Sequence, residues 1–267
     1  MADFEQHKAL YKCVFHDSPT FVDAFFDTIV TNNNTFSIIQ NGIVVASLQM
    51  FEYVMKYSAS EVKCGYIYAV MTHPDYRNRG FMRQLLQTAI TEAKHRKYAF
   101  VFLVEQDQLL HNTYSRFGFK STFAAERYEI LVEPYENNDV VEITIDQAFE
   151  LYNTPEQNTI VATYEMFAFQ CKQVLAEGGV LLTTQIGNKK AWALIANYHT
   201  KLYVVATSGD KTLQLALISK ASYQLGINLV SVPRYNSNKK HGMALIISQD
   251  ISYKMLDNVF VGLLMEE

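Results

Sequence analysis

A short basic segment stands between a predicted strand and a predicted helix and reads Arg77-Asn78-Arg79-Gly80-Phe81-Met82. A strand that turns into a helix leaves the first backbone N–H groups of that helix unpaired, at the positive end of its dipole, where they suit a phosphate or pyrophosphate. Gly80 lets the backbone come close to such a ligand because it has no Cβ, and Arg77, Arg79 and Arg83 add positive charge. The segment therefore favours an anionic ligand, although Arg-x-x-Gly alone is also typical of an ordinary turn with solvated arginines.

Predicted elements on both sides of this segment put it at one end of a sheet. The run Gly65–Thr72 predicts a strand, and apolar residues then recur on one face of a helix from Gly80 to about Lys97. The almost wholly apolar run Tyr98–Val104 is typical of a buried parallel strand. Strand, helix and strand therefore form a right-handed crossover, which a short helix over Leu109–Arg116 and a strand from Phe119 follow.

Two helices and a hairpin precede the crossover. Apolar residues at three-and-four spacing predict helices over Leu10–Phe15 and Phe21–Ile29. Two β-rich runs, Thr35–Gln40 and Ile43–Phe51, are joined by Asn41-Gly42, which is the strongest short signal for a hairpin. We therefore expect these two strands to be antiparallel neighbours.

The second half of the chain repeats the order of elements of the first. A polar stretch over Glu133–Asp139 marks the predicted boundary, with a catalytic lobe over residues 1–135 and a degenerate second lobe over 140–267. The predicted fold is α/β (α+β) with two tandem lobes, each a mixed sheet flanked by helices. The elements predicted for the second half are a helix over Tyr164–Ala176, a strand from Gly179, a turn at Gly187-Asn188, a strand through Trp192, a strand over Leu202–Thr207, a helix over Asp210–Leu225 and a strand over Ile227–Val232.

Two sequence motifs flank the predicted crossover. The first reads Met71-Thr72-His73-Pro74-Asp75-Tyr76 and continues as Arg77-x-x-Gly80-x-Met82, and the second reads Tyr114-Ser115-Arg116-Phe117-Gly118-Phe119. They resemble the pyrophosphate loop and the Tyr-x-x-x-Gly-Phe signature of the GNAT superfamily of acyl-CoA-dependent N-acetyltransferases. The resemblance covers residues 4–132. The whole chain looks like the two-lobed subset related to the enhanced-intracellular-survival type, without its sterol-carrier-like domain.

The resemblance implies acetyl-CoA as cosubstrate and direct transfer of its acetyl group to a primary amine of a small molecule or peptide. It also implies that the pantetheine arm lies along the backbone of the strand before the turn. Met82 stands where the family prefers Gly or Ala, but only its backbone N–H is needed there. The cofactor-binding residues implied are Val70, Met71, Arg77, Asn78, Arg79, Gly80, Phe81 and Met82.

Transfer requires an acid for the departing thiolate and a base for the amine. The resemblance implies that Tyr114 lies near the sulfur, where a phenol can donate a proton. GNAT enzymes often carry a Glu in the strand before the loop, but Gly65–Met71 has none. Glu105 and Glu52, each at the end of a predicted strand, and the terminal carboxylate of Glu267 are the remaining candidates for the base. Tyr114 and Glu105 are the predicted catalytic residues.

Composition narrows the class of protein. With 23 Lys plus Arg against 27 Asp plus Glu, the net charge of −4 gives no general attraction for nucleic acid or a membrane. The histidines and the three cysteines lack metal-ligand spacing, so we expect no metal site and buried, reduced thiols. There is no basic, apolar leader and no run of about 18 apolar residues, which predicts a cytoplasmic protein. The oligomeric state, a homo-oligomer included, stays open.

Two functions from different classes fit these observations. One is the N-acetyltransferase, and the other is a non-catalytic acyl-CoA-binding or protein-interaction module, which the missing strand carboxylate and Met82 leave open. The second lobe is expected to bind no acetyl-CoA, because Ser208 or Asp210 would cap its equivalent helix and take the N–H groups that a pyrophosphate needs. It would instead wall off the acceptor, with a lining from Tyr198, Tyr203 or Tyr235.

Overall fold

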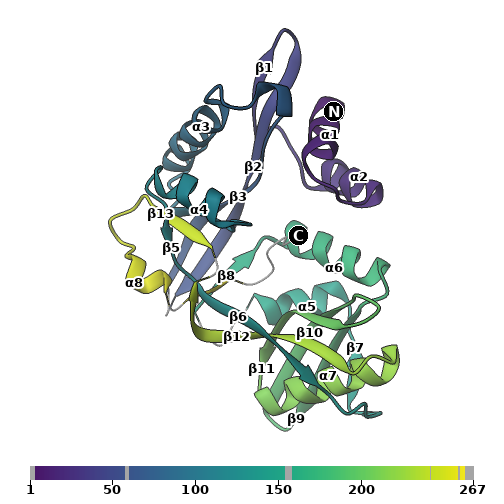
Figure 1. Ribbon diagram of the computed structural model, residues 1–267. Coiled ribbons are helices and arrows are strands. Elements are labelled where there is room, and N and C mark those ends of the chain that lie inside the picture. The colour runs from purple at the N-terminus through teal and green to yellow at the C-terminus, as the bar shows by residue number, and fades with distance from the viewer. Residues whose placement is uncertain (1–3, 58–59, 154–157, 241, 258, 262–267) are drawn as a thin grey trace. The chain divides into compact units, whose positions relative to one another are not determined.

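The computed structural model describes residues 4–57, 60–153, 158–240, 242–257 and 259–261 (Figure 1). It divides into two compact units, neither of which is one continuous stretch of chain. The first lobe comprises Met1–Val54, Val62–Thr122 and Gly242–Leu256. The second comprises Met55–Glu61, Phe123–His241 and Asp257–Glu267. The predicted division into 1–135 and 140–267 is therefore different from the observed one, because each lobe contains a strand from the other half of the sequence.

Two strands account for most of this difference, and the segment Met55–Glu61 accounts for the rest. Strand β6 (Ala124–Leu131), from the first half of the sequence, pairs antiparallel with β12 (Leu229–Lys240) of the second lobe. Strand β13 (Met243–Ile246), from the end of the chain, pairs antiparallel with β4 (Phe100–Leu103) of the first lobe. Each lobe thus completes its sheet with a strand from the other half of the sequence.

The first lobe contains the predicted helices, hairpin and crossover. Strands β1 and β2 are antiparallel, and β3 runs parallel to β4 after the crossover helix α3, as predicted. The elements not yet given are α1 (Glu5–Val14), α2 (Pro19–Thr28), β1 (Thr35–Gln40), β2 (Ile43–Tyr57), β3 (Ser60–Thr72), the 3₁₀ turn η1 (Pro74–Tyr76), α3 (Phe81–His95), α4 (Gln108–Ser115), β5 (Lys120–Ser121) and α8 (Tyr253–Leu256).

Helices cover both faces of the first lobe's strands, and Figure 1 shows α3 on one side of β2 and β3 and α1 and α2 on the other. The α3 face is an aliphatic core, which follows from the alternation of side chains along each strand. The opposite face is aromatic, with the rings of Phe25, Phe51 and Tyr68 within 6.3 Å of one another. The core on the α3 face is formed by Ala46, Leu48, Met50, Ile67, Leu85, Leu86, Ala89, Ala93, Tyr98, Val101, Leu103, Tyr114, Phe119 and Met243.

The second lobe repeats this arrangement. A hairpin turning at Gly187 and Asn188 leads to an antiparallel third strand, a crossover helix and a parallel fourth strand. Its sheet has the order β6-β12-β11-β10-β9-β7, so the predicted fold of two mixed sheets flanked by helices is confirmed. Its remaining elements are β7 (Val140–Glu142), α5 (Ile145–Tyr152), β8 (Thr159–Ala162), α6 (Tyr164–Ala176), β9 (Val180–Ile186), β10 (Lys189–Asn197), β11 (Leu202–Gly209), α7 (Lys211–Leu225) and β14 (Phe260–Val261).

The cysteines follow the sequence-based expectation only in part. All three are free thiols. Cys64 and Cys171 are buried, but Cys13 is exposed, so the expectation of three buried thiols is wrong at that position. Cys13 falls on the solvent side of α1, whose buried residues are its neighbours Leu10 and Tyr11.

Candidate active site

The basic turn is a short loop that ends in an uncapped helix. After β3, the residues Pro74–Tyr76 make a 3₁₀ turn, and Asn78 and Gly80 then take left-handed conformations with φ of 61° and 81°. Helix α3 starts directly after Gly80, and no side chain at this N-cap accepts a hydrogen bond from the first turn. The backbone N–H groups of that turn therefore keep their capacity to bind an anion.

Arginines surround this helix start. Arg77 Nε donates to the carbonyl of Thr72 at 3.3 Å, and Arg79 Nη2 donates to the carbonyl of Asp75 at 3.0 Å. The Arg83 guanidinium lies 5.5 Å from the ring centroid of Phe117. All three arginines are exposed, so their charge is directed at solvent beside the helix start. The structure thus brings together the cationic residues that the sequence analysis singled out.

Phe81 and Met82 point in the opposite direction. Both side chains are half-buried and pack against the core of the α3 face. Met82 therefore leaves its N–H at the start of the helix while its side chain stays out of the loop. A methionine at this position is compatible with the uncapped turn.

The strand before the loop continues beyond its pairing with β4, which ends at Leu103. Pairing of β3 with β4 runs from Cys64 opposite Phe100 to Tyr66 opposite Phe102, and β3 continues beyond it to Thr72. Ala69 has a φ of 46°, which is uncommon for a residue other than glycine and typical of a local irregularity near a functional site. Ile67 and Val70, three positions apart, both pack on the α3-face core, so the alternation of the strand is broken here. No residue pattern in this strand predicts the irregularity.

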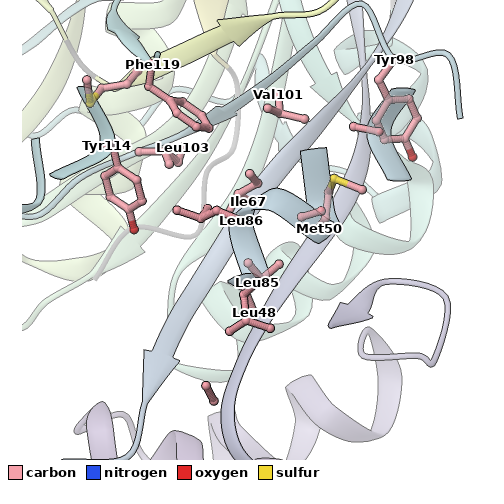
Figure 2. Close-up of a cluster of buried hydrophobic side chains, with 14 residues drawn as sticks. Leu48, Met50, Ile67, Leu85, Leu86, Tyr98, Val101, Leu103, Tyr114 and Phe119 are labelled. Carbon is pink, nitrogen blue, oxygen red and sulfur yellow. The ribbon is translucent and has the colours of Figure 1, made fainter. Parts of the chain in front are cut away.

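Tyr114 lies at one end of the same core. Figure 2 shows it beside Leu103 and Phe119, and its side chain is 5% exposed. Its ring centroid lies 6.0 Å from that of Phe119. Burial, with a smaller contribution from the charge of Glu105, raises the pKa of Tyr114 well above its usual range. The hydroxyl is therefore protonated at neutral pH.

Glu105 is paired with a histidine that sequence reasoning did not select. Its Oε1 lies 2.8 Å from His111 Nδ1, and His111 Nε2 lies 3.4 Å from Ser121 Oγ. The second carboxylate oxygen, Oε2, is buried without a hydrogen-bond partner. His111 and Tyr114 are three residues apart on α4 and so share one face, which is the signal that could have linked them. The two predicted catalytic residues thus lie close enough to interact.

The other two candidates for the base are not brought to this place. Glu52 forms an ion pair with Lys63 at 2.8 Å and accepts a hydrogen bond from Tyr98 at 3.2 Å. Figure 2 shows Tyr98 at the end of the core remote from Tyr114, so Glu52 lies away from the phenol. Glu267 falls outside the described residues.

The equivalent turn of the second lobe has a different chemistry. Asp210 is the N-cap of α7 and accepts hydrogen bonds from the N–H groups of Thr212 and Leu213 at 2.9 and 3.3 Å. It also pairs with Lys189 at 2.9 Å. Ser208 instead accepts a hydrogen bond from Trp192. Of the two predicted caps, Asp210 is the one that forms.

Two of the three tyrosines expected to line an acceptor site lie in contact with each other. Tyr198 is 54% exposed, and its ring contacts Tyr203 at a centroid distance of 5.7 Å. Tyr203 lies under the Arg127 guanidinium at 3.4 Å, a structural contact within the second lobe. The Tyr235 side chain lies outside the described part of the chain.

Comparisons with known proteins agree with this geometry. Residues 1–122 match the family model described as an acetyltransferase (GNAT) domain. This match covers a little under half of the chain and shows that the first part of the sequence is similar to acetyltransferases of that family. No curated protein matches the sequence.

Solved structures extend the likeness to both lobes. A probable N-acyltransferase from Enterococcus faecalis superposes with a TM-score of 0.74 at 11% identity, over 92% of this chain and 71% of that one. A GCN5-related N-acetyltransferase from Anabaena variabilis gives 0.73 at 14% identity, over 92% and 72%. Eis1 from Mycobacterium abscessus gives 0.67 at 9% identity, over 91% and 70%. At these identities the likeness establishes a shared two-lobed fold.

Among the described residues, no group of three or more His, Cys, Asp or Glu side chains could hold a metal ion. In the same part of the chain, no helix is long and apolar enough to cross a membrane.

Proposed function

We propose that this protein is an acetyl-CoA-dependent N-acetyltransferase that moves the acetyl group directly from the thioester to a primary amine of a small molecule or peptide. The observation that carries the proposal is the uncapped start of α3 at Gly80, surrounded by exposed arginines. The α7 helix, which has the same place in the second lobe, is capped by Asp210. One helix start is thus suited to a pyrophosphate and the other is not.

The cosubstrate would extend from this turn along β3. Its pyrophosphate would accept hydrogen bonds from the backbone between Arg77 and Met82. The pantetheine amides would pair with the backbone of Val70 and Met71, beyond the segment of β3 that pairs with β4, in the manner of an added strand. The thioester would then lie beside this part of β3.

Tyr114 would act as the general acid. When the amine nitrogen attacks the carbonyl carbon, the C–S bond breaks and the thiolate takes the phenolic proton. The Tyr114 side chain is protonated at neutral pH, as a proton donor must be. Glu105, held by His111, lies close enough to Tyr114 to act on it electrostatically and is a positioning residue in this account. This role replaces the expectation that Glu105 is the base.

Turnover with a panel of primary amines tests the proposal. The protein is incubated with acetyl-CoA and each amine, and free thiol and acetylated amine are measured together. We expect both products in equal amounts with at least one amine. Binding of acetyl-CoA without either product across the panel would favour the non-catalytic acyl-CoA-binding module.

The number of CoA molecules bound is a further prediction. Titration calorimetry should give one acetyl-CoA per chain, because the Asp210 carboxylate takes the α7 N–H groups and repels phosphate. Asp210→Gly serves as the control, since removal of the cap leaves no arginine cluster there and should not create a second site. Two molecules per wild-type chain would contradict the assignment of the second lobe as a non-binding lobe.

A further inference from the structure

Three side chains of the first lobe form a hydrogen-bonded chain on the aromatic face of the sheet. The Tyr11 hydroxyl, from α1, donates to Asp17 Oδ2 at 2.5 Å. The same hydroxyl lies 3.2 Å from the hydroxyl of Tyr68 on β3. The function proposed above uses none of these three groups, and Tyr68 and Tyr11 are 57 residues apart in sequence.

The direction of the protons in this chain follows from its geometry. Tyr11 has one hydroxyl proton, and the carboxylate of Asp17 can only accept it. The hydrogen bond between the two phenols must therefore be donated by Tyr68. Tyr11 is fully buried, and burial together with the neighbouring Tyr68 and Asp17 raises its pKa far above the usual range, so it holds its proton at neutral pH. A phenol that donates its proton keeps the lone pairs of its oxygen, so Tyr68 is the first member of this hydrogen-bonded series and Asp17 the last.

Tyr68 also lies just beyond the last pairing of β3 with β4. It comes directly before Ala69, whose left-handed conformation interrupts the strand, and two residues after Tyr66, the last residue paired with β4. Its ring packs on Phe25 and Phe51, on the face of the sheet opposite the core that contains Tyr114. A thioester beside this part of β3 would thus have Tyr114 on one side and Tyr68 on the other.

We propose that Tyr68, Tyr11 and Asp17 form the relay that accepts the proton of the attacking amine. The inference rests on the proposed acetyl transfer and identifies the base that it lacks. Tyr114 and the turn that would hold the cosubstrate belong to the α3 side of the sheet, so the acceptor would approach from the aromatic side. Tyr68 would be the catalytic residue that touches the amine, and Tyr11 and Asp17 would be positioning residues that act through it.

The step balances in atoms and charge. The nitrogen lone pair forms the bond to the carbonyl carbon, and the C–S electron pair leaves with sulfur. The amine proton passes to the Tyr68 oxygen as the Tyr68 proton passes to Tyr11 and the Tyr11 proton to the Asp17 carboxylate. Tyr114 gives its proton to the thiolate. To complete the cycle, Asp17, which is half-buried, releases its added proton to solvent, and the Tyr114 phenolate takes up one proton from solvent.

Three variants test the relay in the full-length chain: Tyr68→Phe, Tyr11→Phe and Asp17→Asn. Tyr66→Phe is the matched control, because it removes a phenol from the same strand and the same aromatic face. Each is assayed with a strongly basic alkylamine that the wild type accepts and with a weakly basic amine such as a hydrazide. Acetyl-CoA affinity and the thermal midpoint of unfolding are measured for every variant.

Comparison of the two amines distinguishes a role in proton transfer from a structural role. With the alkylamine, we expect each relay variant to lower kcat by roughly 100-fold or more, the usual contribution of a positioned base. With the hydrazide, the rate should stay near that of the wild type. The tetrahedral intermediate that a hydrazide forms with the thioester is acidic enough to lose its N–H proton to water. Tyr66→Phe should keep both rates, and acetyl-CoA affinity should be unchanged throughout.

Two results would overturn the relay, and they are distinguishable. In the first, the wild type is active and the three variants either keep the alkylamine rate or lose both rates equally. The three side chains would then be only a structural contact between α1 and the sheet, and the proposed function would stand. A wild type that binds acetyl-CoA and acetylates no amine would remove the proposed function and the relay with it.

Discussion

Replacement of Gly80 by aspartate is expected to weaken acetyl-CoA binding at least 100-fold while the protein stays folded. A Cβ at Gly80 meets nothing within 4 Å, so the side chain has room in the free protein. A carboxylate about 5 Å from a phosphate would cost about 3 kcal/mol at an effective dielectric constant near 20. The same carboxylate is favourable beside the free start of α3, so the thermal midpoint should not suffer from the charge.

Gly80→Asn is the matched control for this effect. Asn and Asp have the same shape and are the residues that best tolerate the left-handed backbone of this position, where φ is 81°. The difference in acetyl-CoA affinity between the two variants therefore measures the effect of the charge. Calorimetry should find that the Asn variant binds acetyl-CoA at least 100-fold more tightly than the Asp variant. Equal affinities for both variants and the wild type would remove this turn from the binding site.

Removal of the Tyr114 hydroxyl should produce the largest loss of turnover. Tyr114→Phe keeps the ring packed on Phe119 and Leu103 but leaves the thiolate without its acid. We expect kcat to fall by roughly 10²–10⁴-fold, the range for a positioned general acid, while acetyl-CoA affinity changes little. The measurement is steady-state thiol release at saturating amine, together with calorimetric affinity for acetyl-CoA.

Tyr98→Phe controls for the loss of a buried phenol from the same core. Tyr98 is 2% exposed and lies at the far end of the cluster from Tyr114 (Figure 2). Its hydroxyl donates to Glu52, so its removal should lower stability slightly and leave kcat unaltered. Equal turnover of the Tyr98 and Tyr114 variants would return Tyr114 to a purely structural role.

Local signals explain why much of the fold was predictable. The Asn41-Gly42 dipeptide turns the hairpin between β1 and β2, with Gln40 paired to Ile43. The periodic apolar residues of α3 and the apolar run of β4 predicted a crossover whose strands are parallel. In the second lobe, Asp210 was one of two predicted caps and is the one observed, because a capping side chain acts only on the next few N–H groups.

Contacts between distant residues explain what the sequence could not predict. The pairing of β6 with β12 and of β13 with β4 joins segments about a hundred or more residues apart, and no local pattern encodes it. The observed units therefore differ from the boundary expected at the polar stretch Glu133–Asp139. The hydrogen bonds that link Tyr68, Tyr11 and Asp17 could not be predicted from the sequence either, because α1 and β3 come into contact only in the folded lobe.

Transfer of a labelled acetyl group is the most direct test of the central claim. Acetyl-CoA labelled in the carbonyl carbon is incubated with the wild-type chain and an accepted primary amine, and the products are analysed by mass spectrometry. The account predicts that the label appears in an amide of the amine, in amounts equal to the CoA thiol released, and that the Tyr114→Phe chain forms far less of both. Label retained wholly in bound acetyl-CoA, with no amide from any primary amine, would contradict it.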